Sequence, residues 1–159
     1  MKITLIACGR IKEKFYKDAV AEYAKRLSAY CTLNIIEVAD EKTKENMTEA
    51  ETTQLLDKEA DRILTKVPEG AYVCALAIEG TARDSEGMAR WLRDLTLHGV
   101  SHIVFIIGGS VGLSQKVLDL SKERISFSKL TLPHQLMRVI LLEQLYRWFK
   151  IERGEPYHK

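Results

Sequence analysis

The sequence lacks several features that define whole classes of proteins. Its 159 residues contain only three cysteines, Cys8, Cys31 and Cys74, which are odd in number, far apart and embedded in apolar stretches. With no C-x-x-C pair and no histidine at ligand spacing, we expect reduced core cysteines in a cytoplasmic protein and no bound metal. No stretch approaches the roughly 18 consecutive apolar residues of a membrane span, so neither membrane insertion nor secretion is predicted.

The glycine motifs that bind phosphates are also missing. Gly9, after the first apolar run, stands alone rather than in a G-x-G-x-x-G set, and the glycine-rich segment 108–112 has no following Lys-Ser or Lys-Thr. Both motifs bind phosphates with closely spaced backbone amides. The sequence therefore disfavours a nucleotide-dependent oxidoreductase.

Apolar runs and helical patterns alternate along the whole chain, and 46% of its residues are hydrophobic. Runs that are apolar on both faces are typical of parallel strands covered by helices on both sides. No repeat or Gly/Ser-rich linker divides the chain, so we predict a single α/β domain over 1–159. The expected strands are 2–8, 33–38, 72–78, 102–107 and 124–128, and the expected helices are 12–30, 48–66, 85–98, 114–121 and 133–153.

Two loops follow strands at the edge where open α/β sheets place ligands. Segment 108–112, Gly-Gly-Ser-Val-Gly, allows either a close backbone approach to a ligand or simply a tight turn. Segment 127–132, Phe-Ser-Lys-Leu-Thr-Leu, either presents peptide groups to an adenine edge or is a connection of normal length, with Thr131 as a plausible N-cap.

The last helix and the terminus carry a further group of candidates. The helix is apolar nearly all round, which indicates burial on several sides and a subunit interface. Arg138 lies on its apolar side, so it either completes an ion pair or holds a substrate. Segment 122–159 has eight bases against four acids, and its final seven residues combine cationic and stacking side chains suited to RNA, although a frayed end is the alternative.

In this order, the motifs resemble the RlmH family of SPOUT methyltransferases. The resemblance spans essentially the whole chain, and its most specific parts are the Pro-His-Gln helix start and the Tyr-His-Lys terminus. It is carried by Gly108-Gly109-Ser110, Gly112-Leu113, Ser126-Phe127-Ser128-Lys129, Pro133-His134-Gln135, Met137-Arg138, Glu143-Gln144, Tyr146-Arg147 and Tyr157-His158-Lys159.

The resemblance implies a mostly parallel sheet flanked by helices, with a C-terminal trefoil knot. General folding rules, under which chains do not thread through loops, would not have suggested this knot. It implies a homodimer that methylates N3 of a pseudouridine in 23S ribosomal RNA, within the ribosome. It also implies S-adenosylmethionine as cofactor, bent in the knot against Leu76, Gly108, Phe127, Ser128, Lys129, Leu130, Thr131 and Leu132.

Methylation at N3 requires the imide nitrogen to lose a weakly acidic proton and attack the methyl group in line, with no metal or covalent adduct. We hypothesise that His158 removes the proton, with Tyr157 or Arg153 orienting it or stabilising charge. Arg138 is a second candidate, acting across the dimer. The alternative is that the tail recognises RNA while solvent takes the proton.

Two other functions stay open at this point. One is a SPOUT enzyme acting on another rRNA or tRNA nucleotide, and the other is a non-catalytic RNA-binding dimer. Binding of S-adenosylmethionine in calorimetry separates the second from the enzymes.

Overall fold

A five-stranded sheet in which every neighbouring pair is parallel forms the centre of the computed structural model, which describes residues 1–159. The strand order is β2-β1-β4-β3-β5. This arrangement confirms the predicted α/β fold. The strands are β1 (Lys2–Cys8), β2 (Thr32–Val38), β3 (Tyr72–Ala82), β4 (His102–Ile107) and β5 (Glu123–Ser126). The helices are α1 (Lys14–Leu27), α2 (Glu49–Leu64), α3 (Ser85–Leu97), α4 (Gln115–Leu120) and α5 (His134–Glu152).

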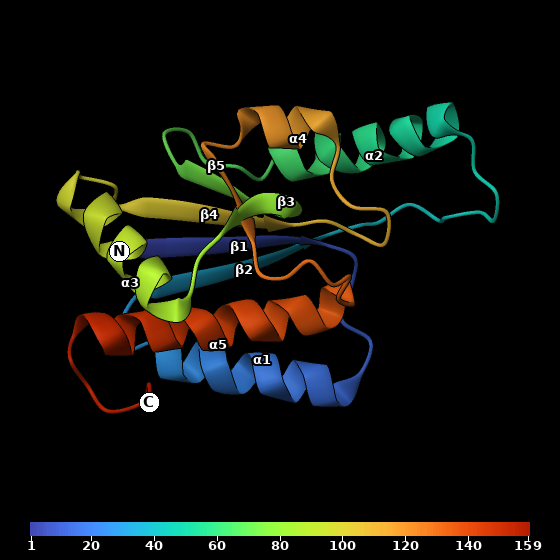
Figure 1. Ribbon diagram of the computed structural model, residues 1–159. Helices are drawn as coiled ribbons and strands as arrows, with labels where there is room; N and C mark the ends of the chain where they lie inside the picture. The colour runs from blue at the N-terminus through green and yellow to red at the C-terminus, as the bar shows by residue number, and fades with distance from the viewer.

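Helices cover both faces of the sheet, with α1, α3 and α5 on one side and α2 and α4 on the other (Figure 1). Each face buries its own apolar cluster because side chains along a strand alternate between the two faces. On β1, Leu5 packs towards α5 in the cluster that contains Trp148, whereas Ile6 packs towards α2 in the cluster that contains Ile63. The strands are therefore apolar throughout, as the sequence pattern indicated.

Three of the five helices, α2, α3 and α4, begin at a side-chain cap, and α1 and α5 do not. Thr48 accepts a hydrogen bond from the Glu51 N–H at 3.1 Å and caps α2, and Asp84 caps α3 by accepting from the Gly87 N–H at 2.7 Å. The N-cap of α5 is Pro133, which makes no side-chain cap. The prediction that Thr131 caps this helix is wrong, because the helix begins at His134 and Pro133 occupies the N-cap position.

Strand β3 is longer than the predicted 72–78 and contains an irregularity. Ile125 of β5 pairs with Leu76 and again with Thr81, so residues 77–80 bulge away from the ladder. The bulge requires a close passage of two backbones, since a Cβ on Gly80 would lie 2.6 Å from the carbonyl carbon of Arg124. The bulge thereby holds residues 77–80 at the carboxyl edge of the sheet.

Helix α5 packs against both α1 and α3, which confirms its predicted burial on several sides (Figure 1). These neighbours in the same chain cover much of the apolar surface that predicted a subunit interface. A partly exposed apolar strip remains on its first half, formed by Leu136, Val139 and Ile140. The interface stays a prediction, and it now depends on this smaller strip.

All three cysteines are free, as predicted. Cys8 and Cys74 are buried and Cys31 is partly buried. Burial raises the pKa of Cys31 to about 11 and, with the nearby Glu59 carboxylate, that of Cys8 to about 12. None of the five helices combines the length and the apolar character that a membrane span requires. The threading of the C-terminal segment into a trefoil knot stays a prediction.

Candidate functional site

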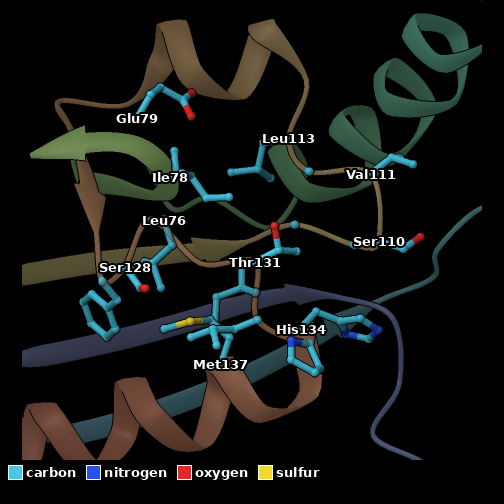
Figure 2. Close-up of a pocket in the computed structure, with 18 of the residues that line it drawn as sticks. Leu76, Ile78, Glu79, Ser110, Val111, Leu113, Ser128, Thr131, His134 and Met137 are labelled. Carbon is cyan, nitrogen blue, oxygen red and sulfur yellow. The ribbon is translucent and has the colours of Figure 1, made fainter.

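A cavity of about 680 Å³ opens at the carboxyl ends of β3, β4 and β5 (Figure 2). Its walls come from three segments: the bulged end of β3, the loop after β4, and the connection from β5 into α5. Most of the lining residues are hydrophobic. The cavity has the size and apolar character of a cofactor site, at the edge where α/β sheets bind ligands.

Seven of the eight residues predicted to contact a cofactor line this cavity. Lys129 is the exception, because its side chain is exposed to solvent and is absent from the cavity wall. The structure thus brings the predicted residues together at one cavity, with Lys129 outside it, and their contact with a cofactor stays a prediction. The seven are Leu76, Gly108, Phe127, Ser128, Leu130, Thr131 and Leu132.

The connection 127–132 leaves most of its peptide groups without a partner in the protein. None of these six residues takes part in a backbone-to-backbone hydrogen bond. The loop is instead held by serines, since Ser128 Oγ accepts from the Leu130 N–H at 2.9 Å and Ser126 Oγ donates to the Ser128 carbonyl at 3.2 Å. Because buried peptide groups need partners, free ones along a cavity wall are suited to a ligand with donors and acceptors on one edge, such as adenine.

The loop 108–112 is a tight turn that also forms a wall of the cavity. The Gly112 N–H donates to the Gly109 carbonyl at 3.2 Å, and Gly112 has a φ of 91°. A Cβ on Gly108 would lie 2.7 Å from the carbonyl carbon of Gly112. The glycine at 108 is therefore required by the loop's own backbone, which confirms the tight turn. A close backbone approach to a ligand stays a prediction.

The cavity wall includes further residues that were not among the predicted cofactor contacts, and six of them come from three places in the fold. The β3 bulge supplies two and the loop after β4 supplies two, while His134 and Met137 lie three residues apart on the first turn of α5. Because residues three apart lie on the same face of a helix, the sequence could have indicated that His134 and Met137 line the cavity together. The six are Ile78, Glu79, Val111, Leu113, His134 and Met137, all labelled in Figure 2.

Arg138 is 1% exposed and bound on several sides. Its guanidinium donates to Glu37 Oε2 at 2.6 Å and to the Gly9 carbonyl at 2.8 Å. Of the two roles left open by the sequence, the structure shows the ion pair. Arg138 does not line the cavity, so it fastens α5 to the carboxyl ends of β1 and β2.

We expect Arg138→Met to destabilise the fold by about 2–4 kcal/mol. It removes the side-chain donor to the Cys8 and Gly9 carbonyls and leaves Glu37 with only the Ile11 N–H. The cost is below that of a fully buried pair since Glu37 is 40% exposed. Urea unfolding at fixed protein concentration measures it. Arg93→Met removes an exposed pair with Asp94 and is the matched control. Equal unfolding free energies for the two variants would contradict the prediction.

The C-terminal tail packs along the second half of α5 rather than at the cavity. The Tyr157 hydroxyl donates to Glu143 Oε1 at 3.1 Å, and burial beside this carboxylate raises the pKa of Tyr157 to about 12. His158 Nδ1 lies 3.2 Å from Arg147 Nη1. Arg153 stacks 4.5 Å from the ring centroid of Tyr30.

One subunit does not bring the tail and the cavity together. Arg147, which contacts His158, lies thirteen residues after His134 on α5. At 1.5 Å per residue this is about 20 Å along the helix axis. The predicted catalytic residues and the predicted cofactor residues are therefore apart within a single chain.

The basic surplus in 122–159 is partly neutralised. Four of its eight bases form ion pairs: Arg124–Asp119, Arg138–Glu37, Arg147–Glu143 and Lys150–Glu155. The other four are exposed, and they are Lys122, Lys129, Arg153 and Lys159. Half of the bases in this segment therefore already have an acidic partner.

Comparison with known proteins gives the family. The family model described as "Predicted SPOUT methyltransferase" matches residues 1–158. A protein of Bifidobacterium adolescentis named ribosomal RNA large subunit methyltransferase H is 56% identical over 159 residues, covering 100% of both chains. The namesake from Listeria monocytogenes serovar 1/2a is 55% identical over the same full length. The chain belongs to the RlmH family of SPOUT methyltransferases.

Solved structures agree on the fold of this SPOUT methyltransferase. A probable methyltransferase from Bordetella pertussis has a TM-score of 0.54 and 12% identity, over 93% of this chain and 96% of that one. A putative methyltransferase from Legionella pneumophila, solved with bound S-adenosylmethionine, has a TM-score of 0.52 and 14% identity over 91% of this chain. The present chain spans 65% of the length of the Legionella chain.

Proposed function

We propose that this SPOUT methyltransferase transfers the methyl group of S-adenosylmethionine to N3 of a pseudouridine in 23S ribosomal RNA. The observation that carries the proposal is full-length identity of 56% to a protein named ribosomal RNA large subunit methyltransferase H. The cavity supports the cofactor, since it combines apolar walls with the free peptide groups of 127–132. The reaction needs no metal, and its substrate places the enzyme in the cytoplasm with the ribosome.

Each part of the site has a physical task in this reaction. S-Adenosylmethionine supplies an electrophilic methyl group on a sulfonium. The peptide groups of 127–132 bind and orient the cofactor, and the turn at 108–112 closes the wall beside it. Holding both reactants in near-attack geometry contributes up to roughly 7–11 kcal/mol to lowering such a barrier. His158 accepts the imide proton, while Tyr157 and Arg153 orient the base and the RNA.

The tail must come from a second copy if it is to act at this cavity. Within one subunit about 20 Å of helix separates them. A two-fold dimer through the apolar strip on α5 would place each tail near the partner's cavity, because an isologous interface brings the same surfaces together in both directions. The homodimer is thus part of the catalytic machinery in this proposal.

We expect a dimer at micromolar concentration in light scattering, and a monomer after Ile140→Glu, because a carboxylate in the strip would be desolvated at the interface. Leu97→Glu is the matched control, since Leu97 is 75% exposed on α3, away from this strip. A monomeric wild-type protein, or an unchanged dimer for Ile140→Glu, would contradict the predicted interface.

Mass spectrometry of ribosomal RNA tests the activity directly. RNA from a strain lacking this protein should lose one N3-methylated pseudouridine, and wild-type protein with S-adenosylmethionine should restore it on isolated ribosomes. Loss of a different methylated nucleotide would replace the proposed substrate by another. An unchanged modification profile together with no cofactor binding in calorimetry would favour a non-catalytic RNA-binding dimer.

A further inference from the structure

His134 is a cavity residue whose ring is fixed by a buried cation. It is the first residue of α5 and lies with Met137 at the cavity wall (Figure 2). Its Nδ1 is 3.3 Å from Nη2 of Arg138, one turn further along the helix. The fold supplies no hydrogen-bond partner to Nε2.

The contact with Arg138 determines where the ring proton is. An arginine guanidinium has donors only and stays protonated in proteins, so Nδ1 of His134 must accept and the proton resides on Nε2. Burial and the Arg138 charge lower the pKa of His134, while Asp40 and Glu59 act in the opposite direction with smaller effect. The ring is therefore a neutral donor at the edge of the cavity.

The ring is also held in place by its surroundings. Arg138 is fastened to Glu37 and to the Gly9 carbonyl. Gly9 also lies close to the imidazole ring, since a Cβ on Gly9 would lie only 3.1 Å from Cε1 of His134. A donor fixed before the reaction begins costs no reorganisation when charge develops beside it.

We propose that His134 donates its Nε2–H to the carbonyl oxygen next to N3 of the target base. This inference rests on the proposed function. When the imide proton leaves to the base, negative charge spreads from N3 onto the neighbouring carbonyl oxygens. The N3–CH₃ bond then forms as the S–CH₃ bond breaks, which leaves the neutral thioether. A neutral donor backed by a buried cation is matched to this transient charge.

The same residue offers a matched pair of variants. In His134→Gln the side-chain amide reaches the position of Nε2 and keeps a donor there. In His134→Asn the shorter side chain keeps an acceptor towards Arg138 and loses the donor. We expect His134→Gln to retain most activity and His134→Asn to lose on the order of 10²-fold in kcat at saturating ribosomes and cofactor.

Three measurements separate catalysis from structure. Calorimetric titration with S-adenosylmethionine counts folded sites, so kcat is expressed per cofactor-binding site, and its Kd should be unchanged in both variants. The rate of His134→Asn should rise to its plateau at higher pH than that of wild type, because the imide has a higher pKa without the donor. A purely structural role would leave this pH profile in place.

Several outcomes would overturn the inference. Wild-type kcat and pH profile in His134→Asn would show that the donor is not used. Weakened cofactor binding in His134→Asn, with normal kcat at saturation, would assign the donor to the cofactor carboxylate instead. Failure of the wild-type protein to form an N3-methylated product would refute the proposed function itself, a result distinct from both.

Discussion

Deletion of Tyr157, His158 and Lys159 will abolish methyl transfer while fold, dimer and cofactor affinity stay close to wild type. Terminal residues contribute little to stability, and Tyr157 and His158 contact side chains that stay partly exposed on α3 and α5. If they position the proton acceptor, their loss removes interactions made in the transition state and lowers kcat far more than cofactor binding. Methylation of isolated ribosomes, calorimetry and light scattering measure the three properties.

His158→Ala alone should lower kcat by on the order of 10²–10⁴-fold if His158 is the base. Lys159→Ala is the matched control, because it removes an exposed charge from the same tail. A tail that only positions RNA would give a different result, with activity recovering at saturating ribosome concentration. Full activity of the truncated protein would assign the terminus no role and move the search for the base to the cavity.

Mixed dimers test whether each tail acts at the cavity of its own subunit or at that of the partner. A tail-deleted subunit has an intact cavity, and a subunit with a blocked cavity has an intact tail. If tails act across the dimer, mixing and re-forming these inactive proteins creates hybrids with one complete site, and activity returns. If each tail acts on its own subunit, no hybrid site is complete and the mixture stays inactive.

The fold was readable from sequence because its strands are buried on both faces, which makes each one a continuous apolar run. Four of the five expected strands end within two residues of those in the structure. The exception is β3, whose extension to Ala82 depends on pairing with β5, a contact between segments far apart in the chain. A local sequence pattern does not predict pairing between distant segments, so Ile78 and Glu79 were not predicted as cavity residues.

The two loops of the candidate site were selected from the sequence, but the contacts between elements that complete the site were not. Position after a parallel strand was enough to select 108–112 and 127–132. The role of His134 depends on Arg138, which depends in turn on Gly9 and Glu37 in other elements. Helical periodicity likewise showed that α5 is buried on several sides but not whether α1, α3 or a second subunit covers each side.

Gly108→Ala should reduce affinity for S-adenosylmethionine by more than about 100-fold, corresponding to at least about 2.7 kcal/mol. The new methyl group would overlap the Gly112 carbonyl and come within 3.0 Å of Leu113 Cγ, so the turn at 108–112 must open. An opened turn displaces one wall of the cavity. Because the turn lies on the surface of the sheet edge, we expect a cost in unfolding free energy of only about 1–3 kcal/mol.

Gly109→Ala is the matched control for this effect. A Cβ at Gly109 meets its nearest atoms, the Glu59 carboxylate oxygens, at 3.6 Å, an ordinary van der Waals contact. The two variants add the same methyl group to adjacent residues of one turn, so a difference between them isolates the clash with Gly112 from any general effect of losing a glycine. Calorimetric affinities that are equal in the two variants would show that the turn tolerates the methyl group, and would remove Gly108 from the residues that shape the cofactor site.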